Sequence, residues 1–234
     1  MNQKQSWQQW CFKIGIFGAL QFLIGTLLAM VIYPGGTIHE PHLETYSFTA
    51  NYFSDLGRTK TFDGTSNMLT HLLFKTTLTI GGLCLIIFFI ALPTIFKKRE
   101  AKFLAVITSF FGIFSGLCYL GIASIPWNID YWGHVFFVKV GFISFLAMTV
   151  FYTLAILLDK SYPKRYAWAF VFFGIILSIQ IFIMFFGPRA WRSNDALLLQ
   201  AIAQKVVVYA EIICMLYQSF GALNRSKFLA KVDI

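Results

Sequence analysis

The fold is decided by the stretch Gly81-Gly-Leu-Cys-Leu-Ile-Ile-Phe-Phe-Ile-Ala-Leu92, which contains no charged side chain. In lipid every backbone polar group must find a partner within the protein, so only helices and closed barrels cross a membrane. The strands of a barrel alternate apolar and polar side chains with a period of two, and this stretch does not alternate. Residues 81–92 therefore predict part of a membrane-spanning helix.

Six apolar stretches of the chain are long enough to cross about 30 Å of hydrocarbon as helices. The composition agrees, because 58% of the residues are hydrophobic, 18% are aromatic and the mean hydropathy is +0.69. We therefore predict an all-α polytopic membrane protein with a single six-helix domain covering residues 1–234. The expected spans are 12–33, 69–92, 103–125, 134–158, 166–187 and 197–220.

The net charge of +9 predicts an orientation, because basic residues concentrate in alternate connections. The side that carries both termini holds Lys4, Lys13, Lys97, Lys98, Arg99, Lys102, Lys160, Lys164, Arg165, Arg225, Lys227 and Lys231. The opposite loops hold Arg58, Lys60, Arg189 and Arg192 together with Glu40, Glu44, Asp55, Asp63, Asp130 and Asp195. The positive-inside rule then places both termini in the cytoplasm. Because orientation accounts for the basic residues, we expect no nucleic-acid partner.

The one long connection, residues 34–68, lies on the predicted outer side. Long loops without regular structure are uncommon in compact proteins and are usually functional or disordered. Disorder is disfavoured by its apolar and aromatic residues, which are Tyr46, Phe48, Tyr52, Phe53 and Leu56. We therefore expect this loop to fold back as an extracytoplasmic lid over the helix ends.

Lys75, Lys139 and Lys205 occupy nearly the same depth in the second, fourth and sixth spans. With a rise of about 1.5 Å per residue, each lies roughly 7 to 12 Å below the outer end of its helix. A charge in the membrane costs about 2.5–3.5 kcal/mol on insertion scales, so such residues usually face a bundle interior or a wet cavity. The three lysines predict a basic pocket that opens to the outer face. The alternative is that each ammonium snorkels to the interface.

Further candidate ligand-binding residues surround this depth. His71 shares a helix face with Lys75 one turn away, and His134 opens the fourth span. The predicted rim and counter-ions are Arg58, Arg189, Arg192, Asp55, Asp63 and Asp130. The pocket either binds an anion through charge-assisted hydrogen bonds or is neutralised by Asp55 and Asp130 as a structural latch.

Catalysis is a second interpretation, with Ser54, Asp55, His71 and His134 as its candidate residues. Two histidines and a carboxylate, such as His71, His134 and Asp55, would suffice for a catalytic zinc with an open position. The chain has no HExxH motif, and the nearby lysines would repel a cation, so we expect no metal and keep zinc as the alternative. Glu211 is the only acid well inside a span, and its partner cannot be identified from the sequence.

Residues 51–57 (Asn-Tyr-Phe-Ser-Asp-Leu-Gly), Asn67 and the opening of the next span at Leu73-Phe74 carry a resemblance. Over about residues 12–220 the chain resembles a six-span prokaryotic membrane family of unknown function, domain family nine-nine-eight. That family is distantly similar to the eukaryotic DRAM/Sfk-type membrane proteins. The resemblance implies a Ser-Asp motif after the first span, here Ser54-Asp55, and a histidine that opens the fourth, here His134. It also implies an outer polar site, the prokaryotic plasma (inner) membrane and a connection to lipids.

The predicted function is recognition of an anionic lipid headgroup or similar amphiphile in an outward-facing basic pocket. The first alternative is a membrane-embedded lipid hydrolase or acyl-transfer enzyme, with or without zinc. The second is a structural subunit that binds another copy or a membrane partner through the small-residue face of Gly112 and Gly116.

Overall fold

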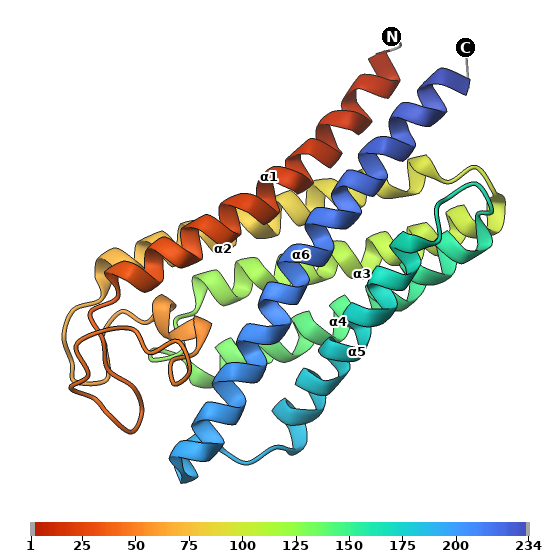
Figure 1. The fold of residues 1–234 in the computed structure, drawn as a ribbon. Coiled ribbons are helices and arrows are strands. Elements are labelled where there is room, and N and C mark those ends of the chain that lie inside the picture. The colour runs from red at the N-terminus through yellow and green to blue at the C-terminus, as the bar shows by residue number, and fades with distance from the viewer. Residues whose placement is uncertain (1–2, 233–234) are drawn as a thin grey trace.

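Six long helices form the fold of the computed structural model, which describes residues 3–232 (Figure 1). They are α1 (Gln3–Ile32), α2 (Met68–Ala91), α3 (Arg99–Ser124), α4 (Tyr131–Leu158), α5 (Arg165–Phe186) and α6 (Asn194–Val232). Short 3-10 helices lie in the connections as η1 (Phe53–Gly57), η2 (Leu92–Ile95) and η3 (Ala190–Arg192). Within the described residues the chain forms no strand, and only an isolated bridge joins Lys60 to Ser66.

All six helices are long and apolar enough to cross a membrane, which confirms the predicted six-span fold class. The helices start and end within a few residues of the predicted spans, except that α1 begins at Gln3 and α6 continues to Val232. Hydropathy detects only the apolar part of a helix, and residues 221–232 interrupt their apolar residues with Asn224, Arg225, Ser226, Lys227 and Lys231 while staying readily helical. The ends of α1 and α6 therefore project together beyond the other helices (Figure 1).

The helices pack in a closed ring. Each contacts its neighbours in sequence, and α6 returns to contact α1. All six contribute to one apolar core, whose fully buried aromatic residues include Phe88 and Phe89 of α2, Phe145 and Tyr152 of α4, and Phe170 of α5. The core fixes which side chains face inward and therefore which polar groups lie inside the bundle.

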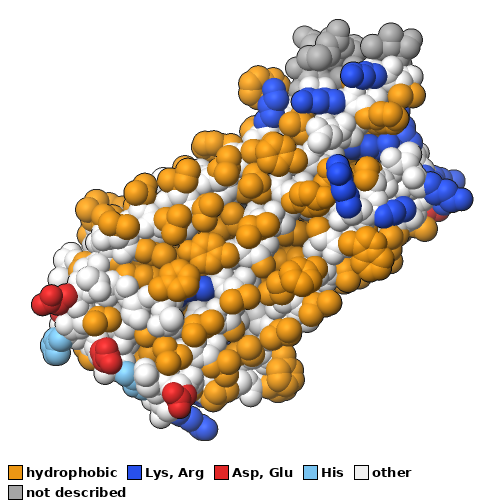
Figure 2. Space-filling view, in the orientation of Figure 1, with side chains coloured by type: hydrophobic (Ala, Val, Ile, Leu, Met, Phe, Trp, Pro, Cys, Tyr) orange, Lys and Arg blue, Asp and Glu red, His pale blue; other side chains and the backbone are white. Residues whose placement is uncertain are grey.

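The two ends of the bundle differ in charge. Lys and Arg gather where the two termini lie, whereas Asp, Glu and His appear mainly at the other end of the visible face (Figure 2). We name these the terminal end and the loop end, since the 33–67 segment covers the latter. At the terminal end the buried Arg225 guanidinium lies 3.2 Å from the carboxylate of Asp159 and donates to the Ser161 carbonyl. This contact ties α6 to the α4–α5 turn.

The small-residue face of α3 lies inside the chain. A Cβ added to Gly112 would meet the ring of Phe89 at 2.3 Å, and one added to Gly116 would meet the backbone oxygen of Gly82 at 2.9 Å. Conversely, a Cβ on Gly82 would meet the Gly116 oxygen at 2.8 Å. These glycines allow α2 and α3 to approach closely, as small residues do in membrane bundles. Because α2 covers this face, a partner would have to bind elsewhere.

We predict that Gly82→Ala destabilises the bundle by about 1–3 kcal/mol, the usual cost of overpacking a well-packed contact. The neighbouring atom is backbone, which cannot rotate away. The matched control is Gly174→Ala in α5, whose new Cβ would lie at an ordinary 3.5 Å from Thr149. Thermal unfolding in detergent measures both. Equal unfolding temperatures for the two variants would contradict the close α2–α3 contact.

Candidate functional site

The loop between α1 and α2 folds back over the helix ends. Its η1 segment buries Phe53, Asp55, Leu56 and Gly57 against the bundle. Asp55 organises this turn, because its Oδ2 accepts hydrogen bonds from Asn51 Nδ2 at 3.0 Å and from the Tyr52 N–H at 2.8 Å. The loop is therefore part of the packed structure.

Lys205 of α6 contacts the bundle-facing side of this loop. Its side chain is only 2% exposed, and its ammonium donates a hydrogen bond to the backbone carbonyl of Asn51. The rings of Tyr46 and Phe48 have centroids 5.3 Å from the ammonium, and that of Phe53 lies at 5.9 Å. Aromatic faces within about 6 Å attract a cation, so the loop supplies a cage for this charge.

The electrostatics of the loop couple Asp55 to two cations. Burial raises the pKa of the Asp55 carboxyl above its usual range. The hydrogen bonds from Asn51 and Tyr52 and the positive charges of Arg58 and Lys205 act in the opposite direction but do not cancel the effect of burial. Its second oxygen, Oδ1, is buried without a hydrogen-bond partner. Asp55 is therefore a buried acid whose hydrogen bonds are made within the lid, to Asn51 and Tyr52.

The structure separates the three lysines that the sequence analysis placed together. Lys75 is exposed on α2, whereas Lys205 is enclosed under the loop. Lys139 is half-buried, with its ammonium 4.8 Å from the ring centroid of Phe185. Depth along a helix does not determine rotation about its axis, and rotation decides which side chains meet. Of the three, Lys139 lines the cavity described next.

That cavity, which we name the loop-end cavity, has a volume of about 190 Å³. Residues of the loop, α4, α5, η3 and α6 surround it. Its polar lining comprises Ser54, His134, Lys139, Gln180, Arg189, Gln200 and Gln204, and its aromatic lining comprises Tyr52, Trp127, Tyr131, Trp132 and Trp191. No Asp or Glu is among the lining residues, so the wall carries positive charge only.

Three buried polar atoms at this cavity have no hydrogen-bond partner in the described structure: Trp127 Nε1, His134 Nε2 and Gln180 Oε1. The other ring nitrogen of His134, Nδ1, lies 2.7 Å from the carbonyl oxygen of Ile125. A carbonyl only accepts, so Nδ1 carries a proton, and in the neutral form of the ring Nε2 then offers a lone pair. Leaving a buried polar atom unpaired costs about 1–3 kcal/mol. These unpartnered atoms belong to residues that line one cavity, which makes it the candidate site.

Two glutamines of α6 connect the cavity wall to its surroundings. Gln204 Oε1 accepts from the Phe53 N–H at 2.8 Å, and Gln200 Nε2 donates to the Pro188 carbonyl at 3.0 Å. These bonds hold the start of η1 and the α5–α6 connection against α6. The wall is thus fixed by backbone contacts from two segments far apart in sequence.

The remaining predicted site residues have structural contacts. His71 Nδ1 bonds the Gly57 carbonyl at 2.7 Å, which holds the end of η1 against α2. The Arg58 guanidinium lies over the rings of Phe62 and Trp127, 4.0 and 4.4 Å from their centroids. Arg189 lies 5.5 Å from the ring centroid of Trp191, and Arg192 is exposed in η3. Of these four, Arg189 alone lines the loop-end cavity.

Two of the predicted counter-ions form local hydrogen bonds instead of pairing with the lysines. Asp130 caps α4 by accepting from the Gly133 N–H at 2.9 Å. Asp63 accepts hydrogen bonds from Thr61 and Thr65, and these bonds lower its pKa to about 2. The third, Asp55, is the acid whose charge acts on Lys205.

The donor set considered for zinc does not assemble. Among residues 3–232, no three His, Cys, Asp or Glu side chains lie close enough together to share a metal ion. The set of His71, His134 and Asp55 is therefore not gathered around one point. His71 and Asp55 are also engaged by the lid through Gly57, Asn51 and Tyr52.

Three residues of the candidate site and its lid were not predicted from the sequence. Gln180 is the one amide side chain within the apolar sequence of α5, and an isolated polar residue in such a helix could have been recognised as a candidate for an inward-facing position. Trp127 lies in a loop beside other aromatic residues, a pattern usual at a membrane interface, yet its indole N–H is buried and the residue lines the cavity. Asn51, which supplies the carbonyl for Lys205, carries no detectable signal because any residue offers a backbone oxygen.

No protein-family model, curated protein or solved structure matches this chain. The resemblance to the six-span family of unknown function stays a prediction. Of the residues that carry it, Ser54 and His134 both line the loop-end cavity, and Asp55 lies buried in the adjoining turn.

We predict that Lys205→Met releases the lid, since methionine keeps the apolar stem but cannot donate to Asn51. Amide hydrogen exchange of residues 51–57 should become faster, because the segment loses its charged anchor. Lys75→Met is the matched control, because that lysine is exposed at a similar depth. Exchange that stays at the wild-type rate in Lys205→Met would show that the contact does not hold the loop.

We also predict a pH dependence of the lid. Because burial raises the pKa of Asp55, the closed lid binds more protons than the open one, and its stability falls as the pH rises from about 4. Exchange protection of residues 51–57, corrected for intrinsic rates, should therefore decrease from acid toward neutral pH. Asp55→Asn should remove this trend and Asp63→Asn should keep it. A trend of the opposite sign in the wild type would contradict the assignment.

Proposed function

We propose that the loop-end cavity binds an anionic lipid headgroup or a similar amphiphile. The observation that carries the proposal is a wall with cations and no acid, combined with unpartnered polar atoms. Lys139 and Arg189 would supply charge-assisted hydrogen bonds to a phosphate or carboxylate. Trp127, His134 and Gln180 would bond the polar atoms of the same headgroup.

The surroundings of the cavity favour an amphiphile over a purely polar anion. Part of its wall is apolar, from Val135, Val138 and Met184. Trp132 and Trp191 line the same cavity and are 75% and 56% exposed, the arrangement expected of side chains at headgroup level. A ligand held by Lys139 and Arg189 could thus keep its apolar part in contact with apolar walls.

In this proposal the loop end faces outward from a prokaryotic plasma membrane and both termini face the cytoplasm. The support is the gathering of Lys and Arg at the terminal end (Figure 2). The ligand would then come from the outer leaflet or the outer aqueous phase. The cavity requires no cofactor for this role.

We predict that Lys139→Ala and Arg189→Ala each weaken binding of a short-chain phosphatidylglycerol about tenfold or more. Hydrogen bonds to charged groups contribute about 1.5–3 kcal/mol, and every 1.4 kcal/mol is a factor of ten. Calorimetric titration of the detergent-solubilised protein measures the affinity, and Lys75→Ala is the matched control. Short-chain phosphatidylcholine and inorganic phosphate are the comparison ligands.

The outcomes separate the sources of the anion. Binding of phosphatidylglycerol but not phosphate would support an amphiphile, and binding of phosphate alone would replace it by a small anion. Equal affinity for phosphatidylcholine, or no loss in Lys139→Ala and Arg189→Ala, would overturn the proposal.

A second candidate function is hydrolysis or acyl transfer on a bound lipid. It is favoured by one observation: Ser54 and His134 line the same cavity, and the free lone pair of His134 Nε2 is fixed by the bond from Nδ1 to Ile125. A histidine held in one tautomer is suited to general-base chemistry. Release of fatty acid from the lipid, abolished in Ser54→Ala and His134→Gln, would promote this candidate over simple binding.

A further inference from the structure

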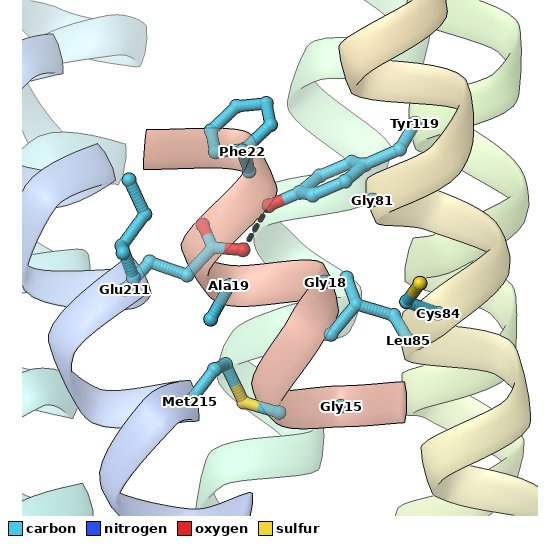
Figure 3. Close-up of a pocket in the computed structure, with 11 residues that line it drawn as sticks. Gly15, Gly18, Ala19, Phe22, Gly81, Cys84, Leu85, Tyr119, Glu211 and Met215 are labelled. Carbon is cyan, nitrogen blue, oxygen red and sulfur yellow. Dashed lines mark hydrogen bonds between the residues drawn. The ribbon is translucent and has the colours of Figure 1, made fainter. Parts of the chain in front are cut away.

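A buried acid lies deep in the bundle, away from the loop-end cavity. Glu211 of α6 is 7% exposed and lies roughly 25 Å along the helix from Asn194. The hydroxyl of Tyr119 on α3 donates to its Oε1 across the bundle (Figure 3). An ionisable side chain at this depth is costly and normally marks a functional site.

Glu211 borders two cavities. The first, which we name the Glu211 cavity, has about 40 Å³ and lies between α1, α2, α3 and α6 (Figure 3). The second, the middle cavity, has about 60 Å³ and is also lined by Phe22, Tyr119 and Glu211. The acid therefore stands where these two internal spaces meet.

The middle cavity leads toward the loop end. It shares four lining residues with the loop-end cavity, namely Ser54, His134, Val138 and Gln204. The Glu211 cavity and the middle cavity each exceed the roughly 10–15 Å³ that a water molecule needs. Ser54, His134 and Gln204 supply polar side chains to the wall between the middle cavity and the loop-end cavity. The three cavities are thus neighbours in the order loop-end cavity, middle cavity and Glu211 cavity.

Toward the terminal end the bundle is closed by aromatic packing. Phe12 of α1 and Phe88 of α2 are fully buried and meet edge to face with centroids 5.6 Å apart. A Cβ on Gly15 would meet Ser219 Oγ at 2.7 Å and the Phe88 ring at 2.9 Å, so α1, α2 and α6 touch there. At this level the packing of α1, α2 and α6 therefore separates Glu211 from the terminal end.

The groups that face Glu211 include no cation. No lysine or arginine lines the Glu211 cavity or the middle cavity. The titratable neighbours come from four helices: Cys84 of α2, Tyr119 of α3, His134 of α4 across the middle cavity, and Cys214 of α6. The lining residues from α1 are not titratable; they are Gly15, Gly18, Ala19 and Phe22. Burial without a cationic partner disfavours a carboxylate, so this setting favours the neutral acid.

We propose that Glu211 is a proton-exchange site that takes up and releases one proton toward the loop end. On release, the carboxyl O–H bond breaks and the proton joins water in the middle cavity, leaving by way of His134 and Ser54. Tyr119 keeps its own proton and donates its hydrogen bond to the carboxylate. The ligand of this second site is the proton itself, and the proposal does not rest on lipid binding in the loop-end cavity.

Infrared spectroscopy of the full protein in lipid vesicles tests the site. The difference between wild type and Glu211→Gln should isolate the C=O stretch of a protonated carboxylic acid. That band should shift when H₂O is replaced by D₂O, because the proton exchanges. Tyr119→Phe should move the band to higher frequency through loss of the hydrogen bond. Carboxylate bands in place of the C=O band, or a band that never shifts in D₂O, would overturn the proposal.

The route is tested on α4. Val138→Trp fills the wall shared by the loop-end and middle cavities and should slow the D₂O shift of the Glu211 band several-fold. Val150→Trp is the matched control, since that residue lies on the same helix and is 49% exposed. Val138→Phe replaces Val138→Trp if the larger variant does not fold. Equal exchange rates in the α4 variants would exclude a route from the loop end.

Discussion

The ammonium group of Lys205 is enclosed at the loop end, where burial leaves it little contact with water. A buried charge must be compensated by the protein, and here a loop far away in sequence does so with the Asn51 carbonyl and three aromatic rings. The Asp55 turn that presents this carbonyl is itself buried. The lid therefore needs Lys205 to hold it in place, and the buried charge of Lys205 needs the lid for its hydrogen bond and its aromatic contacts.

This coupling shapes the cavity beside it. With η1 held in place, Tyr52 and Ser54 become walls of the loop-end cavity, opposite the α4 and α5 residues. Because Lys205 is compensated by the lid, its charge is not available there, and Lys139 and Arg189 remain as the cations of the cavity. At the terminal end Arg225 and Asp159 form a second buried anchor, so α6 is fixed at both ends.

The sequence predicted the helices well and the site only in part. Spans follow from long apolar runs, which is a local property, and α2 and α4 lie close to their predicted bounds. Lys75, Lys139 and Lys205 look equivalent by depth, yet their environments differ because helix rotation is set by packing of the whole core. His134 and Arg189 were candidates because polar residues near span ends are visible in sequence, and Ser54 was a candidate through the Ser54-Asp55 motif of the resemblance. Tyr119, the partner of Glu211, was not, because a tyrosine within an apolar helix is usually a packing residue.

The most direct test of the account is native mass spectrometry of the protein purified from its own membrane in mild detergent. The account predicts one anionic lipid per chain, retained in Lys75→Ala and lost when Lys139 and Arg189 are both replaced by alanine. A neutral lipid, a zinc adduct, or an anionic lipid that survives the double substitution would contradict the central claim that the loop-end cavity recognises an anionic headgroup.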